Sequence, residues 1–243
     1  MGIINAWLMR LGPDFRTATW YIFIALLVVI TCTLTGHYCS KIVRSQYRAI
    51  ICSLLAFISF VFVILVALFI EKITDNYILL SGVTYYIPYI LCASYILSKY
   101  VNCSFLEMAD LLVLSYLPAR AVNIIGCTGA GCCQGIPVEW GLYSAILKEN
   151  VVPVQLYESC CIFAIWFILK GLYKRNRFVQ HGRCAVYSTI LFGGLNVFTD
   201  IFTYIQPKIV YMVSVEGVFA FLTMCTGLIS LYIFDNKSTK QKK

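Results

Sequence analysis

The segment from residue 126 to residue 135, GCTGAGCCQG, contains four glycines and three cysteines in ten positions. Glycine allows tight turns and lets the backbone approach a ligand closely, so the amide groups of such a segment could surround an anion. The spacing G-x-x-G-x-G-x-x-x-G fits neither a dinucleotide fingerprint nor a P-loop, and no lysine and hydroxyl pair follows it. The segment is therefore predicted to hold a different anionic group.

Four ionisable residues stand inside the apolar sequence on both sides of this segment: Arg120, Glu158, Asp200 and Glu216. In a membrane helix each would cost about 2.5 to 3.5 kcal/mol, so they need partners or water. We expect Arg120 and the three acids to line one water-accessible cavity. The alternative is that Arg120 pairs with one carboxylate only to join two helices. Two further acids, at positions 107 and 110, are expected to be interfacial residues.

The composition indicates an integral membrane protein. Of the 243 residues, 60% are hydrophobic and only 12% are charged, which is too few charges for a water-soluble surface of this size. We predict a single all-α transmembrane domain over residues 1–243, because the apolar segments approach or exceed the roughly 20 residues that a spanning helix needs. The seven predicted transmembrane helices cover about residues 17–36, 49–70, 76–98, 105–127, 153–172, 184–205 and 209–234.

The basic residues predict the orientation of these helices. Thirteen of the 19 lysines and arginines fall on the side that holds the loop with Lys41, Arg44 and Arg48. By the positive-inside rule this side is cytoplasmic, so the amino terminus lies outside and the carboxyl terminus inside. The glycine-rich segment, Glu158 and Asp200 then lie toward the outer leaflet. Tyr85, Tyr86 and Tyr89 are expected in an aromatic belt at the same side.

The cysteines allow two further interpretations. Cys127, Cys132 and Cys133 would lie on the oxidising side of a bacterial plasma membrane, where a disulfide could form. Their C-x4-C-C spacing has no nearby histidine and no second pair, so it predicts no metal site. The absence of C-x-x-C argues against a redox motif. Cysteines within the predicted spans are expected to pack as small apolar side chains.

Several motifs together resemble one family, the prolipoprotein diacylglyceryl transferases. The glycine-rich segment is followed by Pro-Val-Gln-Leu-Tyr-Glu at residues 153–158, then by Phe-Gly-Gly-Leu at residues 192–195 and the acid Asp200. Near the amino terminus, Gly12-Pro13 and Trp20-Tyr21 are similar to the opening pattern of that family. The glycine-rich segment itself matches a branch that reads G-C-x-x-x-G-C-C-x-G.

This resemblance implies a seven-helix enzyme of the bacterial inner membrane that uses no cofactor. It would move the diacylglyceryl group of phosphatidylglycerol, or of a similar phospholipid, onto the lipobox cysteine of a prolipoprotein peptide, with no nucleic acid involved. Tyr21, Glu158 and Asp200 are the expected catalytic residues, with Glu158 as the base. The expected substrate-binding residues are Arg120, Gly126, Gly131, Gly135, Gln155, Tyr157 and Asn196.

The chain also departs from the family pattern. The arginine of the family's loop falls on Ile124, its helix-six arginine falls on Asn196, and its histidine has no counterpart. Arg120, one helical turn before Ile124, is expected to replace the first arginine. Two alternatives to a transferase stay open: a catalytically inactive lipid-binding member of the family, and a membrane thiol oxidoreductase that uses the cysteines.

Overall fold

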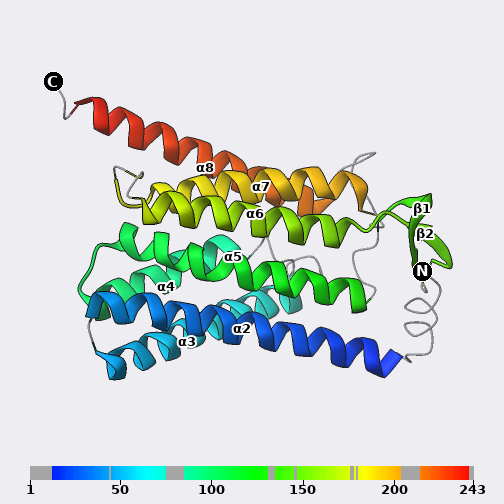
Figure 1. Ribbon diagram of the computed structural model, residues 1–243, viewed down its shortest axis with the longest axis horizontal. Helices are drawn as coiled ribbons and strands as arrows, with labels where there is room; N and C mark the ends of the chain where they lie inside the picture. Colours follow the sequence, from blue (N-terminus) through cyan, green and yellow to red (C-terminus); the bar gives the residue numbers. More distant parts are fainter. Residues whose placement is uncertain are drawn as a thin grey trace.

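The computed structural model describes residues 13–43, 45–74, 85–130, 135–144, 147–175, 178, 180–203 and 214–240. Its architecture is a bundle of long helices, as the hydrophobic pattern predicted (Figure 1). The helices are α2 (Pro13–Val43), α3 (Gln46–Thr74), α4 (Tyr86–Val101), α5 (Phe105–Ala130), α6 (Val154–Lys174), α7 (Arg183–Phe202) and α8 (Val215–Lys240). A short antiparallel pair, β1 (Pro137–Ser144) and β2 (Glu149–Val151), forms the one sheet in the described residues, which departs from the all-helical prediction.

Six of these helices are long and apolar enough to cross a membrane, and α4 is the shorter seventh, with 16 residues. The span predicted over residues 76–98 begins in residues that lie outside the described part of the chain. The helix predicted over 105–127 continues to Ala130 instead. In Figure 1, α2 begins at one end of the bundle and α8 ends at the other, as an odd number of crossings requires.

Two ends of the bundle need names. The basic end is the one where α2, α4, α6 and α8 finish, and Lys41, Lys99 and Lys174 lie in the last turns of the first three of these helices. The hairpin end is the opposite one, beyond which β1 and β2 stand (Figure 1). By the positive-inside rule, the basic end is predicted to face the cytoplasm.

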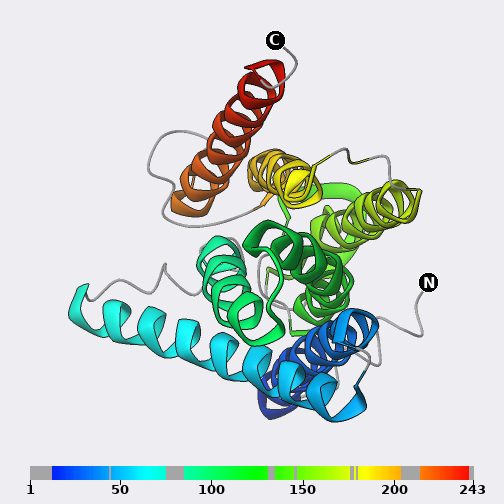
Figure 2. The same cartoon turned by 90° about the vertical axis from the view of Figure 1, so that its left-hand side faces the viewer.

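Helix α5 occupies the centre of the bundle. Most of its span is buried inside the protein, whereas a third or less of every other candidate span is buried. It packs against α2, α4, α6 and α7, and Figure 2 shows these helices around it. Because ionisable residues in membranes are tolerated where they face the protein interior, α5 is the helix best able to carry Arg120.

Side chains from α6 fix its position along α5. Pro118 lies inside α5 and has no N–H, so the carbonyl of Leu114 loses its usual helical donor. Trp166 of α6 replaces that donor: its Nε1 donates to the Leu114 oxygen at 2.9 Å. Two helical turns away, the Ser159 hydroxyl donates to the Ala121 oxygen at 2.9 Å. These two bonds set the antiparallel register that places the first turns of α6 beside residues near 120.

Replacing Trp166 with phenylalanine is expected to lower the free energy of unfolding by about 1 to 3 kcal/mol, since the ring packing stays while the buried Leu114 carbonyl loses its donor. Thermal unfolding of the purified protein in detergent measures the effect. Trp140→Phe is the matched control, because Trp140 is 69% exposed on β1. Equal unfolding temperatures for the two variants would contradict this role of Trp166.

At the basic end, Asp110 joins α5 to the start of α7. Its carboxylate accepts the backbone N–H groups of Gly182 at 2.7 Å and of Ala185 at 2.8 Å. These are among the amides that a helix start leaves without helical partners. Gly182 has φ 92°, a backbone conformation that favours glycine. Asp110 is 1% exposed, so the expectation of an interfacial residue was wrong: it is a buried cap that bridges two helices.

At the hairpin end, backbone hydrogen bonds connect three segments that are distant in sequence. Ile136 donates to the carbonyl of Phe202 at the end of α7, at 2.9 Å. Val152, just before α6, donates to the carbonyl of Ile136 at 3.0 Å, and Gly135 forms an antiparallel bridge with Thr203. The segment after the glycine-rich stretch is therefore held to both α6 and α7.

Candidate active site

Arg120 lies on α5, whose candidate membrane span ends at Thr128. At the rise of a helix, the eight residues between them place Arg120 roughly 12 Å inside this end of the span. The side chain is partly buried, and its Nη1 donates to Oδ1 of Asn123 at 2.8 Å. Asn123 itself is only 5% exposed. Residues three apart share one helix face, so the amide holds the guanidinium toward the interior of the bundle.

Glu158 approaches this guanidinium from α6. The guanidinium of Arg120 is surrounded by protein, and Tyr116, Glu158 and Tyr85 lie close enough to act on its charge. The surroundings of Tyr116 contain the same groups, with Arg120, Tyr85 and Glu158 all acting on it. We call Arg120, Asn123, Glu158, Tyr85 and Tyr116 the Arg120 cluster. Its members come from α5, from α6 and from the residue that precedes α4, so the bundle brings together a cation, a carboxylate and phenols inside the membrane-spanning region.

The tyrosines of α4 form a wall beside this cluster. Tyr86 and Tyr89 are fully buried, and the ring centroids of Tyr86 and Tyr116 lie 5.3 Å apart. The Tyr86 hydroxyl lies 2.9 Å from the hydroxyl of Ser188 on α7. An aromatic belt would place these two rings at the headgroup level on the outer surface, so that expectation was wrong for Tyr86 and Tyr89. They pack inside the protein, Tyr86 against α5 and α7 and Tyr89 against α3 and α5.

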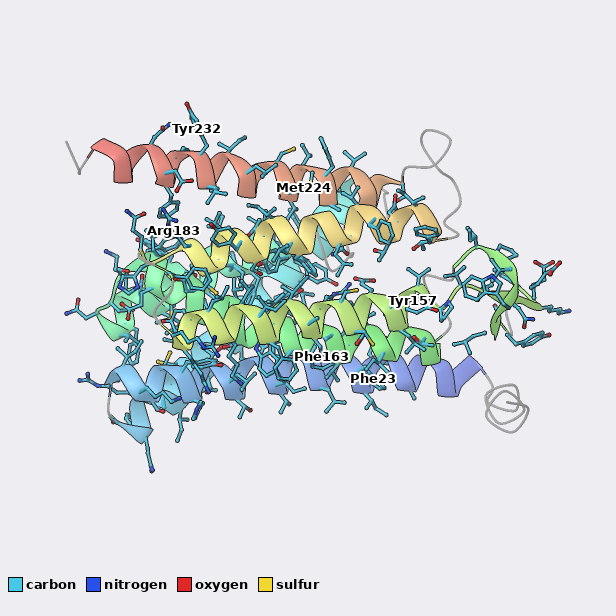
Figure 3. The ribbon with its side chains drawn as sticks, turned by 45° about the horizontal axis from the view of Figure 1, so that its top comes forward. Phe23, Tyr157, Phe163, Arg183, Met224 and Tyr232 are labelled. Carbon is cyan, nitrogen blue, oxygen red and sulfur yellow. The ribbon has the colours of Figure 1, made fainter. Side chains whose placement is uncertain are left out.

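The first turns of α6 carry three of the predicted site residues. Gln155 is buried, Glu158 is partly buried in the Arg120 cluster, and Tyr157 is 53% exposed. Figure 3 shows Tyr157 near the hairpin end of α6, well away from Arg183 at the basic end. Consecutive residues on a helix point about 100° apart, so Tyr157 and Glu158 face different surroundings.

The structure gives the predicted glycines different surroundings. Gly126 is helical, in α5, and a Cβ there would collide with the Phe23 side chain, so this glycine permits close packing of α2 on α5. A Cβ at Gly135 would collide with the carbonyl of Val152. Only glycine therefore allows the chain before β1 to lie this close to the residues before α6. Gly131 and the cysteines at 132 and 133 lie outside the described residues. The amide of Gly126 serves the helix, so this glycine does not offer its N–H group to an anion.

The other predicted residues lie elsewhere. Both carboxylate oxygens of Asp200 are used by Ser214: Oδ2 accepts its N–H at 3.0 Å, and Oδ1 accepts its hydroxyl. Ser214 in turn accepts the N–H of Gly217 at 3.1 Å, so Asp200 holds the start of α8. Asn196 donates to the Phe192 carbonyl at 2.8 Å within α7. Tyr21 lies near the hairpin end of α2 and is 61% exposed, and the Glu216 side chain is outside the described part.

Sequence reasoning missed three members of the cluster: Asn123, Tyr116 and Tyr85, the last of which was expected in an aromatic belt. Asn123 follows Arg120 by one helical turn, and this i,i+3 spacing was a usable signal. Tyr116 precedes Arg120 by four residues, which is the other same-face spacing. Both signals are present in the sequence of a central helix, where polar residues face protein rather than lipid.

The sequence profile of the prolipoprotein diacylglyceryl transferases matches residues 15–233, which is most of the chain. The chain belongs to this family. A phosphatidylglycerol–prolipoprotein diacylglyceryl transferase of Clostridium tetani (strain Massachusetts / E88) is 28% identical over 148 residues. The matched stretch covers 58% of this chain and 57% of that relative, little more than half of its length. No solved structure matches the chain.

Membership of the prolipoprotein diacylglyceryl transferase family confirms the resemblance seen in the sequence and the multi-pass membrane fold. At the level of the family, the match supports a transferase that acts in lipoprotein biosynthesis. The helix that carries Arg120 and Asn123 and the helix that carries Glu158 both lie within the matched range. The Arg120 cluster therefore lies within the part of the chain that the family profile matches.

Proposed function

We propose that this chain transfers the diacylglyceryl group of phosphatidylglycerol to the lipobox cysteine of a prolipoprotein, and that the Arg120 cluster is the reaction site. The observation that carries the proposal is that α6, fixed on α5 by the Ser159 and Trp166 bonds, brings the carboxylate of Glu158 near the guanidinium of Arg120. Charged side chains inside a membrane are costly, and intramembrane ionisable residues mark functional sites by default. The family match supports this chemistry over a purely structural joint.

Each residue has a role in this reaction. Glu158 would take the proton of the cysteine thiol as the sulfur attacks the glyceryl carbon that carries the phosphate. A C–S bond forms, the C–O bond to phosphate breaks, and glycerol phosphate leaves with the electron pair. Arg120, oriented by Asn123, would stabilise the negative charge on the departing phosphate, which is the group whose charge grows. Gln155 would order the first turn of α6 around Glu158.

The remaining predicted residues have supporting roles in the proposal. Tyr21 and Tyr157 would contact the substrates near the hairpin end, where both side chains are exposed. Gly131 and Gly135 would shape the loop above the site, and Asn196 and Asp200 would hold α7 and α8 in place. With the basic end in the cytoplasm, the hairpin end faces outward, so the reaction takes place in the outer leaflet of the bacterial inner membrane.

Purified protein in lipid nanodiscs tests this proposal directly. The donor is phosphatidylglycerol with labelled acyl chains, and the acceptor is a lipobox peptide, with a Cys→Ser peptide as the control. We expect label on the cysteine peptide only, in a bond that resists hydroxylamine as a thioether does, together with released glycerol phosphate. Lipid binding without any labelled thioether would reject the transferase and favour an inactive lipid-binding protein. Oxidation of cysteines during turnover would favour the oxidoreductase.

A further inference from the structure

The hairpin formed by β1 and β2 starts and ends beside the ends of membrane-spanning helices. The candidate span of α7 ends at Phe202, whose carbonyl accepts the N–H of Ile136, just before β1, at 2.9 Å. The candidate span of α6 begins at Val154, three residues after β2 ends at Val151. Because a spanning helix ends near the edge of the hydrocarbon core, the base of the hairpin lies at the membrane surface. Figure 1 shows the hairpin directly beyond this end of the bundle.

A bulge in β1 keeps Trp140 close to the level of this surface. Pro137 and Leu142 both pair with Val151, so residues 138–141 leave the ladder instead of extending it away from the bundle. Trp140 therefore lies about as far along the hairpin as Val151, three residues from the start of the α6 span. At the rise of a strand this is at most roughly 10 Å beyond the hydrocarbon core. The headgroup layer is about 5 to 8 Å thick, and an indole ring is long enough to cover the difference.

Two contacts hold the backbone on either side of Trp140. The side-chain amide of Asn150 donates to the Glu139 carbonyl at 3.2 Å. Gly141 lies so close to the carbonyl of Val151 that a Cβ there would collide with it. Trp140 is nevertheless 69% exposed, so the bulge presents the indole to its surroundings instead of burying it.

The exposed aromatic residues of the hairpin follow lipid-facing residues at the same end of the bundle. Tyr157, near the start of α6, is 53% exposed and Phe198, near the end of α7, is 60% exposed, and both belong to candidate spans. On β1, Trp140 and Tyr143 are exposed beside the charged Glu139. Tryptophan and tyrosine among polar groups suit the headgroup layer, which covers the apolar ring while its polar atoms stay hydrated. In water the indole would leave its apolar surface uncovered.

We propose that the bulge of β1 anchors the hairpin on the membrane surface, with the ring of Trp140 inserted in the headgroup layer at the hairpin end. By the positive-inside rule, this is the headgroup layer of the outer leaflet. The partner is therefore a lipid surface. The proposal uses no residue of the Arg120 cluster, so it stands or falls independently of the reaction proposed above.

Depth-dependent quenching of tryptophan fluorescence tests the anchor on the full-length protein in nanodiscs. The emission of the wild type minus that of Trp140→Phe reports Trp140 alone. The quenchers are phosphatidylcholines brominated near the glycerol end or near the methyl end of their acyl chains, and water-soluble acrylamide. We expect bromine near the glycerol end to quench Trp140 at least about twofold more than bromine near the methyl end. Acrylamide should quench it at least about threefold less than it quenches free N-acetyltryptophanamide.

Trp166 is the depth control, measured in the same way with Trp166→Phe. It lies 12 residues after Val154, where the α6 span begins, so roughly 18 Å along the helix and near the bilayer centre. Its quenching should show the opposite order, with the stronger effect from bromine near the methyl end.

Three results would overturn the anchor. Ready quenching of Trp140 by acrylamide, with little effect of either lipid, would place the hairpin in water. The quenching order of Trp166 would place the ring in the hydrocarbon core. Protection from acrylamide that appears only after a lipobox peptide is added would make the bulge a peptide contact instead of a membrane anchor.

Discussion

Arg120→Ala is expected to lower the rate of diacylglyceryl transfer by roughly 10² to 10³-fold, the usual cost of removing one charge-stabilising donor from a reaction site. The physical reason is that the arginine is the one cation in the described part of the cluster, and no second family arginine is present at Ile124 or Asn196. The rate is measured as labelled peptide formed per minute at saturating lipid, so that loss of binding and loss of turnover are separated.

Two comparisons make this result specific. Arg183→Ala removes another arginine from the end of a span, where Arg183 pairs with the exposed Asp235 at 2.8 Å. Exposed ion pairs contribute little, so this variant should keep its transfer rate. Arg120→Lys keeps the charge but loses the planar guanidinium, and an intermediate rate is expected. Full activity in Arg120→Ala would remove Arg120 from the reaction and leave it as a joint between helices.

Asp110→Ala is expected to destabilise the protein by about 3 kcal/mol, because two buried backbone N–H groups at the start of α7 lose a charged acceptor. The unfolding temperature in detergent should fall clearly. Asp110→Asn keeps one acceptor oxygen and should lose about half as much. Glu107→Ala, in the first turn of the same helix, is the control. An Asp110→Ala protein that unfolds with the wild type would show that water or another group satisfies these amides.

The membrane fold was predictable because it depends on composition over long windows. Twenty apolar residues in a row leave few alternatives to a spanning helix, and basic loops indicate direction whatever the side-chain packing. The family was predictable for another reason: the residues around the glycine-rich stretch and at 153–158 are an unusual combination. Both conclusions are confirmed by the helices and by the family match.

The details of the site depend on contacts between distant residues, which local patterns do not contain. Asp110 accepts the N–H of Gly182, 72 residues later, just before α7. Trp166 donates to the Leu114 carbonyl, 52 residues earlier, which Pro118 leaves without a helical donor. Asp200 was grouped with Glu158 because both are acids near the same membrane face, yet Asp200 serves Ser214. The sequence indicates depth in the membrane, but helix rotation decides which acids meet.

The glycine-rich stretch shows the same limit. Glycine is a weak indicator of loops in a membrane protein, where it also lets two helices approach closely. Gly126 is such a case: it lies within α5, and the side chain of Phe23 on α2 packs directly on it. Gly135 instead lies against the backbone of Val152, just before α6. The β1–β2 pair was missed because β2 has only three residues, too few for a periodic pattern.

The central claim is that Arg120 and Glu158 act together on one reaction, and a double-mutant cycle on transfer rate tests it most directly. The rates of wild type, Arg120→Lys, Glu158→Gln and the double variant are compared in the nanodisc assay. Residues that act as a unit show non-additive losses, so the double variant is expected to be little slower than the slower single variant. If the two losses multiply, or if Glu158→Gln transfers at the wild-type rate, the two residues do not share a site.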